Sequence, residues 1–276
     1  MSTQLGVLPM QAAFCEGSSP LDLSGNTSRQ GIYLVEAVQR YVFGQRWLDV
    51  DGRVFKYSGS KSAVSPGYGA ANGTAASAII NSVTPAAYVV GDETILVTVA
   101  SDEGYAGTGL VAANELAGGY VTFGHGAEAG AQTRRILKNT AVAANGGTTT
   151  LKLDGPVGYA VAAGGACEVQ LNPYAYLKKG ALEYNAFMCV PATYVSAADK
   201  YFWGQSWGPC WMVPGGGDTT PGNTANDRTA YFVGDGSVNF GYALVIESGY
   251  QKAGFCIDST SGSVSAMPLV MLQISI

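Results

Sequence analysis

Strand-length runs of β-branched and aromatic residues recur along most of this chain, and glycine-rich turns separate them. Few stretches carry the 3.6-residue period of a helix. Runs with the length of single strands include Thr94–Val99, Gln132–Leu137, Thr148–Leu153, Ala166–Leu171 and Tyr242–Ile246, and Phe255–Ile257 with Leu269–Ile274 is predicted as a closing hairpin. Short strands at near-regular spacing are typical of sandwiches and barrels. We therefore predict an all-β fold of small β-barrel or β-sandwich domains, with an extended N-terminal arm and long Gly-rich loops.

The strongest local signal is a hairpin around Asp51-Gly52, between the runs 46–50 and 53–57. Asp-Gly between two apolar runs favours a two-residue type I′ turn, because both central residues need positive φ. That loop length sets the register, and every second side chain then shares one face. The predicted buried face holds Leu48, Val50, Phe55 and Tyr57.

Changes in composition along the chain predict three parts. Residues 1–40 are irregular, with breaks such as Ser18-Ser19-Pro20, and read as an arm with a weak helical turn near Tyr33–Arg40. Residues 93–154 hold a set of four strands and read as a small inserted β domain. Residues 41–92 and 155–276 then form the main β domain.

The sequence contains few residues of the types that usually catalyse reactions. It holds one histidine in 276 residues, and only 13% of its residues are charged. A three-histidine zinc site is excluded within one chain, no G-x-S-x-G elbow exists, and a serine-type triad would need His125 as its base. We expect no enzyme activity, no catalytic or metal-ligating residues and no cofactor.

Other clusters have simpler interpretations than a site. Asp49–Gly52 begins like a calcium loop but lacks its glycine and glutamate spacing, so the hairpin is preferred. Gly67–Gly69 and Gly107–Gly109 lack the context of a phosphate-binding loop. Paired carboxylates for glycoside hydrolysis could meet only in the fold, and nothing selects a pair. The candidates are Asp102, Glu103, Glu115, Glu128, Glu183 and Glu247.

Charge and cysteine content bear on partners and compartment. The net charge is −5 and no basic stripe is visible, which argues against direct nucleic-acid binding. The five cysteines form no C-x-x-C, so reduced and mostly buried thiols are expected. No signal peptide and no membrane-spanning stretch are evident, so we expect assembly in a cytoplasm and no membrane contact.

An aromatic run over Tyr201–Trp211 holds three of the four tryptophans. In a strand, alternate residues from Tyr201 to Trp207 share a face, and such a stripe can pack a core, stack sugars or anchor a protein interface. Core packing is the commoner outcome, and the sequence leaves all three open. The interface candidates are Tyr201, Trp203, Trp207, Trp211, Tyr174 and Trp47.

Several blocks, taken in order over residues 41–276, resemble the capsid decoration, or head-associated, proteins of tailed bacteriophages. The more specific blocks are Asn172-Pro173-Tyr174, which ends a strand, and the run that closes on Trp207-Gly208-Pro209. The other matching blocks are Phe43–Arg46, Asp51–Tyr57, Ala117–Val121, Gln132–Asn139, Gly241–Ala243 and Pro268–Leu272.

The resemblance implies a virion structural protein that stabilises the icosahedral head from outside. Its partners would be the major capsid protein and copies of itself, with a trimer as the expected oligomer. The arm would drape over a neighbour and become ordered on binding, so we expect deletion of residues 1–30 to weaken shell binding and to spare the fold of residues 41–276. The alternative is a carbohydrate-binding or adhesin module of a virion fibre that binds a host-surface glycan through an exposed Trp203/Trp207 face.

Overall fold

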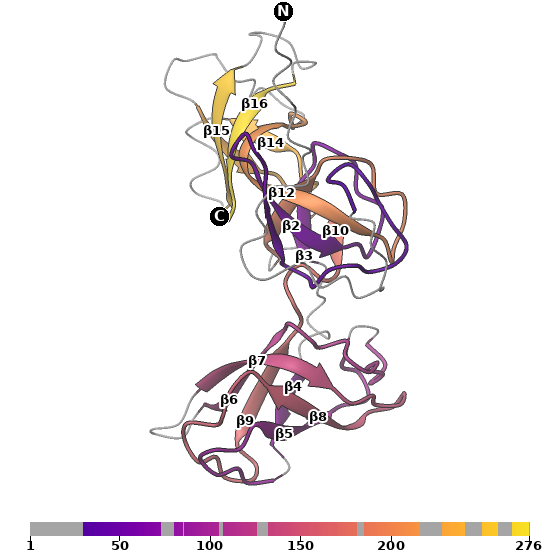
Figure 1. The fold of residues 1–276 in the computed structure, drawn as a ribbon, viewed down its shortest axis with the longest axis vertical. Coiled ribbons are helices and arrows are strands. Elements are labelled where there is room, and N and C mark those ends of the chain that lie inside the picture. Colours follow the sequence, from indigo (N-terminus) through magenta and orange to yellow (C-terminus); the bar gives the residue numbers. More distant parts are fainter. Residues whose placement is uncertain are drawn as a thin grey trace, which may run out of the picture. The chain divides into compact units, whose positions relative to one another are not determined.

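The computed structural model describes residues 30–72, 80–84, 86–104, 107–125, 132–180, 185–215, 228–240, 250–258 and 267–275. These residues form strands, turns and irregular segments without a helix, so the all-β prediction is confirmed (Figure 1). The chain divides into two compact units. Unit 1 consists of residues 1–73 and 174–276, and unit 2 of residues 74–173.

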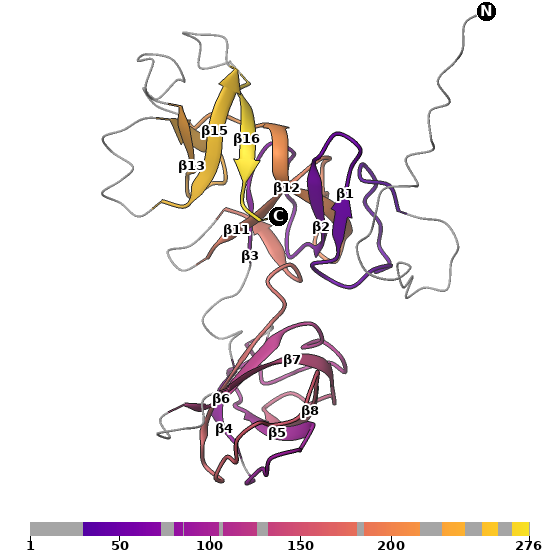
Figure 2. The ribbon, with the colours of Figure 1, turned by 60° about the vertical axis from the view of Figure 1, so that its left-hand side comes forward.

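Unit 1 holds a ten-stranded antiparallel sheet. Its main path runs β10-β3-β11-β12-β16-β15-β13-β14, and the hairpin β1-β2 joins it through β12 (Figure 2). The strands are β1 (Arg46–Leu48), β2 (Val54–Gly59), β3 (Ala70–Asn72), β10 (Leu177–Lys179), β11 (Phe187–Pro191), β12 (Tyr201–Trp211), β13 (Thr229–Phe232), β14 (Val238–Phe240), β15 (Lys252–Asp258) and β16 (Leu269–Gln273).

Unit 2 holds a six-stranded antiparallel sheet in the order β4-β9-β6-β7-β8-β5. Its first and last strands approach each other, so the sheet curls into a nearly closed barrel. The strands are β4 (Ile80–Val83), β5 (Thr94–Val99), β6 (Tyr120–His125), β7 (Gln132–Asn139), β8 (Gly147–Leu153) and β9 (Ala166–Gln170). Strand β5 has the predicted bounds, and β7, β8 and β9 differ from prediction by one or two residues at an end.

The boundaries of the units differ from the predicted insertion at 93–154. Strand β4 pairs with β9 inside the sheet of unit 2, with Ile80 opposite Val169. A barrel needs both strands to cover its apolar interior, so the inserted unit extends to residues 74–173. The sequence prediction assigned only the four most regular runs to the inserted domain and placed the segments of β4 and β9 in the main domain.

Four similar turns precede strands of unit 2. Each begins at a bridge residue and reaches a left-handed residue three positions later. The left-handed residues are glycine or asparagine, the types that adopt positive φ at least cost. The bridges join the turns in pairs, the first with the last and the second with the third. The turns are Tyr88–Gly91, Val111–Asn114, Val142–Asn145 and Val161–Gly164.

The side chain of Tyr88 supports the open edge of β5. Its hydroxyl accepts from the Leu96 backbone N–H at 2.6 Å and donates to the Leu96 carbonyl at 3.1 Å. Within the described sheet, β5 pairs with β8 on one edge only. The hydroxyl therefore takes the place of a neighbouring strand at this position.

We expect Tyr88→Phe to destabilise unit 2 by about 2 kcal/mol, because two backbone groups lose their partner. Hydrogen exchange at Thr94–Val99 should accelerate accordingly, while tryptophan fluorescence, which reports on unit 1 alone, should show an unchanged unfolding midpoint. Tyr159→Phe is the matched control, since Tyr159 is exposed. Equal exchange in both variants would contradict the role given to the Tyr88 hydroxyl.

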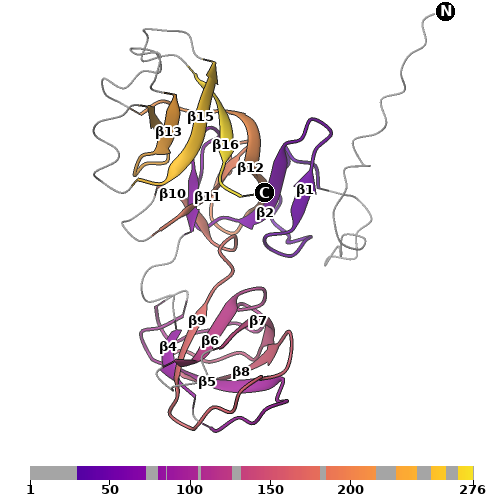
Figure 3. The same ribbon diagram turned by 90° about the vertical axis from the view of Figure 1, so that its left-hand side faces the viewer.

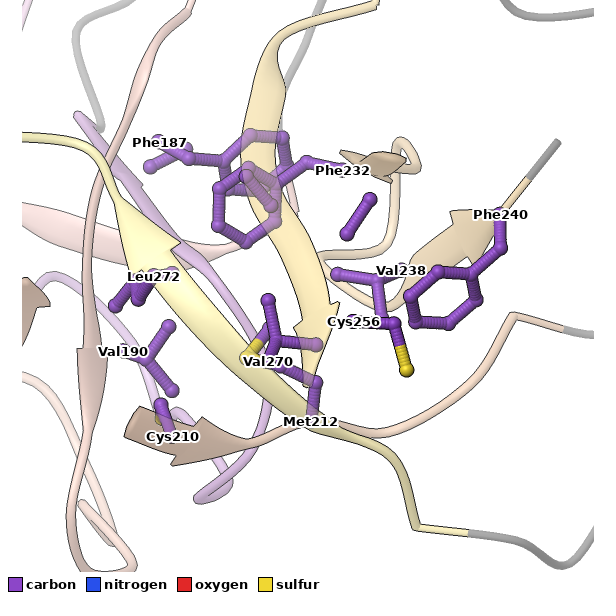
Figure 4. Close-up of a cluster of buried hydrophobic side chains, with 13 residues drawn as sticks. Phe187, Val190, Cys210, Met212, Phe232, Val238, Phe240, Cys256, Val270 and Leu272 are labelled. Carbon is purple, nitrogen blue, oxygen red and sulfur yellow. The ribbon is translucent and has the colours of Figure 1, made fainter. Parts of the chain in front are cut away.

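Among the described residues of unit 1, a core cluster of 13 buried side chains lies beneath β12, β16, β15 and β13 (Figure 4). Phe187 and Phe232 stack with ring centroids 4.4 Å apart. Cys210, Val270 and Cys256 face inward from three adjacent strands, where the register places them opposite one another. Because side chains alternate along a strand, their neighbours in sequence face outward.

The β1-β2 hairpin forms, but its register differs by one residue from the predicted one. Asp49 pairs with Arg53, and Gly52 has φ of 85°, so the loop has three residues in place of two. The shift turns Trp47 into the core opposite Phe55 and leaves Val50 81% exposed. A single-residue slip moves every side chain to the other face of a strand, which is why the predicted buried position of Val50 is wrong.

The part of the predicted arm that the structure describes is packed against unit 1. Gln30 is fully buried and Ile32 belongs to an aromatic cluster. Glu36 forms a backbone bridge to Tyr201, at the start of β12. Turns and bends replace the helical turn predicted near Tyr33–Arg40. Residues 1–29 and the predicted strand Tyr242–Ile246 lie outside the described residues.

Candidate protein interface

Two of the six predicted interface residues lie in the core of unit 1. Trp203 is 1% exposed and Trp47 9% exposed. Their rings meet edge to face, with centroids 5.2 Å apart, and Trp203 also contacts Tyr57 at 5.1 Å. Both indoles therefore pack in the core, the first of the three roles left open for the aromatic run, and neither contributes appreciably to the surface of the folded chain.

The reason lies in the position of β12. Its first half pairs with β2 on one edge and with β11 on the other, and other segments cover both of its faces. The Trp203 indole N–H donates to the backbone carbonyl of Gln30, 3.2 Å away, so residues far apart in sequence complete this core. An alternating stripe alone could not show that the second face is also covered.

Three other candidates are half-buried. Tyr201 stacks on Tyr57, with centroids 6.4 Å apart and planes 9° from parallel. The Tyr174 hydroxyl lies 3.1 Å from the Ser275 hydroxyl, near the last described residue. Trp207 lies where the register between β12 and β2 shifts. Trp211 is 38% exposed, at the far end of β12.

Trp211 belongs to a larger exposed apolar surface on the outer side of the sheet. The register places Pro209, Met271 and Phe255 in one row across β12, β16 and β15. A second row holds Trp211 opposite Leu269, with Ile257 beside them on β15. We name these six residues the apolar face. Figure 3 shows the strands that carry it side by side, with β13 next to β15.

The strands fix the side chains of the apolar face in position, but no described segment covers them completely. Phe255, Ile257 and Leu269 are 41%, 39% and 37% exposed. Each belongs to a strand whose alternate residues enter the core, so the backbone beneath them is fixed. Contiguous exposed apolar side chains on an ordered sheet mark an interaction surface more often than isolated ones do.

Gly254 sets the position of Phe255. Its φ is +152°, and a Cβ built on it would lie 1.9 Å from the carbonyl oxygen of Met271. Only glycine allows β15 to approach β16 this closely at that point. The next residue, Phe255, then projects outward beside Met271.

The residues with reactive chemistry form no site in the described part of the chain. Asp49 and Asp51 both accept from the Arg53 guanidinium, at 2.8 and 2.6 Å, so the hairpin interpretation of this segment is supported. The carboxylates of Glu103 and Glu115 accept from backbone N–H groups in turns. Burial raises the pKa of Glu115, and its backbone hydrogen bond opposes that change.

The remaining candidates add no cluster to this part of the chain. His125 lies in β6, but its side chain is outside the described set, as are Glu128, Glu183 and Glu247. No group of three or more potential metal ligands occurs among the described residues. No helix of the described ranges has the length and apolar character to cross a bilayer.

Four of the five cysteines are described, and all four are buried and free. Burial raises the pKa of Cys167, Cys189 and Cys210 to about 12, and also raises the pKa of Cys256. These thiols stay protonated at neutral pH and act as small apolar groups. The prediction of reduced, buried thiols is confirmed for these four.

Sequence reasoning missed most of the apolar face. Phe255, Ile257, Leu269 and Met271 lie in runs that were predicted as closing strands, without a role for their outward side. The available signal was that both alternate sets of side chains in these strands are apolar, which leaves an uncovered apolar surface on a one-layer sheet.

Comparison with protein-family models, with curated proteins and with solved structures finds no match for the chain.

Proposed function

We propose that this protein decorates and stabilises the head of a tailed bacteriophage by binding the major capsid protein through the apolar face. The observation that supports this is the set of six outward apolar side chains in two adjacent rows across β12, β16 and β15, with aromatic anchors at Trp211 and Phe255. Aromatic anchors of this kind carry a large share of the binding energy of protein interfaces.

The low charge of the chain fits the same role. Only 13% of its residues are charged, so few charges would lose their hydration when a shell covers the surface. Many copies on one particle, each with a modest contact, would add as avidity. In this proposal the protein acts on the outer surface of the head, touches copies of itself as a trimer, and needs no cofactor.

Glycan binding through Trp203 and Trp207 has less support as an alternative. Trp203 packs against Tyr57 and Trp47 and offers no free ring face to a sugar. Shell binding requires no rearrangement of this core. We therefore retain the head protein as the proposed function.

The proposal predicts that Phe255→Lys weakens binding to purified shells by about thirtyfold or more, because a charge replaces a central apolar anchor. Tyr194→Lys is the matched control, since Tyr194 is exposed in unit 1 and lies outside the apolar face. Affinity is measured by co-sedimentation with shells that lack the protein, after tryptophan fluorescence has shown that both variants are folded. Equal binding of the two variants would reject this interface.

A further inference from the structure

The apolar face raises a question of solubility before assembly. Free copies that expose Trp211, Phe255 and Leu269 together would associate with one another through these faces. A protein that must stay dispersed until it meets a shell needs a cover that the shell can displace. The chain itself contains a segment of suitable chemistry.

That segment is Met1–Cys15, which carries no charged side chain; the first is Glu16. Its larger apolar residues match the chemistry of the apolar face, and no charged side chain would be buried in the contact. Residues 16–29, by contrast, include charged residues and several Ser, Gly and Asn residues, a composition suited to a tether. The large apolar residues of the segment are Leu5, Val7, Leu8, Met10 and Phe14.

The attachment point of the tether lies within reach of the apolar face. Gln30 is fully buried and donates to the Tyr201 carbonyl at 2.8 Å, at the start of β12. Trp211 ends the same strand, roughly 33 Å along it. Residues 16–29 span up to roughly 46 Å when extended, so the segment can reach the face of its own chain.

We propose that Met1–Cys15 packs on the apolar face of its own chain and is displaced when the shell binds. The tether holds the segment at an effective concentration in the millimolar range, so a weak contact is enough to keep the face covered. The shell displaces the segment because it offers the apolar face a larger contact surface and many binding sites. Displacement also frees the segment to lie on a neighbour. This inference rests on the proposed function for the need of a displaceable cover and for the identity of the displacing partner.

Cys15 makes the contact measurable in the purified protein without any shell. The four described thiols are buried, so a short bifunctional maleimide reports on Cys15 and one introduced thiol. Ile257→Cys places that thiol on the apolar face, and Tyr194→Cys places it on an exposed position outside the face. We expect the intramolecular crosslink of Ile257→Cys to form about tenfold faster than that of Tyr194→Cys.

Deletion of residues 1–15 provides a second measurement that needs no crosslinker. It should raise the binding of a hydrophobic dye to the folded protein severalfold, and Phe255→Lys in the shortened chain should remove that gain. Equal crosslinking rates for the two introduced thiols, crosslinks between chains at low concentration, or unchanged dye binding after deletion would each overturn the inference. Shell binding by Phe255→Lys separately tests the proposed function, so the two failures can be told apart.

Discussion

Gln30→Ala is expected to lower the free energy of unfolding of unit 1 by about 3 kcal/mol, since a fully buried side chain loses three hydrogen bonds. The Gln30 side chain donates to the carbonyls of Leu34 and Tyr201, each at 2.8 Å. It accepts from the Tyr57 hydroxyl at 3.0 Å. Burial raises the pKa of Tyr57, so that hydroxyl stays a donor at any physiological pH. Alanine would remove all three bonds, so the Leu34 carbonyl would lose its side-chain donor and the Tyr57 O–H its acceptor, whereas the Tyr201 carbonyl would keep the bond from the Glu36 N–H.

The measurement is urea unfolding followed by tryptophan fluorescence, because all four tryptophans belong to unit 1. Gln39→Ala is the matched control, since the Gln39 side chain donates one hydrogen bond, to the Tyr41 carbonyl, and should cost about 1 kcal/mol or less. A pair of truncations gives the same test. Removal of residues 1–29 should leave unit 1 stable, whereas removal of residues 1–30 should cost at least as much as Gln30→Ala.

This result would also revise the extent of the arm. The sequence interpretation placed all of residues 1–40 outside the main domain and expected that deletion of residues 1–30 would spare the fold. In the structure, Gln30 and Ile32 belong to the buried core of unit 1. If Gln30→Ala and Gln39→Ala were equally stable, the network around Gln30 would not carry the stability assigned to it.

Gly254→Ala is expected to cost about 4 kcal/mol, because it combines a strained backbone with a collision. A side chain at φ of +152° is unfavourable, and its Cβ would lie 1.9 Å from the Met271 carbonyl oxygen. Backbone cannot yield as a flexible side chain does. Strands β15 and β16 must separate at this point, and the row that joins Phe255 to Met271 would be broken.

Gly31→Ala is the control within the same unit, since its Cβ would meet only Leu34, at 3.9 Å. We expect it to change the unfolding free energy by less than about 1 kcal/mol. Phe255→Lys should leave the fold intact and weaken shell binding, whereas Gly254→Ala should impair both the fold and the binding. Near-native stability of Gly254→Ala would show that β15 and β16 are not held as closely as described.

Local sequence signals predicted the strands well and their partners less well. Thr94–Val99 is a strand with the predicted bounds because its side chains alternate between a covered and an exposed side. The hairpin at Asp51-Gly52 was expected, but Asp-Gly fits both a two-residue loop and a three-residue loop with glycine last. Local propensity does not decide between these loops. The burial of Trp47 does, because it selects the register that places the indole in the core.

The candidate interface was harder to predict, because local sequence signals do not show which strands become neighbours. The aromatic run of β12 is visible in the sequence, but the strands that pair with its edges, β2 and β11, and the segment at Gln30 that packs on Trp203 come from distant parts of the chain. Trp203 is therefore buried and Trp211 is exposed, although both belong to one run. The apolar face depends on the pairing of β12, β16 and β15, which a single sequence does not reveal.

The most direct measurement of the central claim adds the purified protein to shells that lack it and records both the bound copies and the temperature at which the shells open. We predict saturable binding with a fixed number of copies per shell and a higher opening temperature, both lost in Phe255→Lys. A protein that leaves the opening temperature unchanged and does not sediment with the shells would contradict the account.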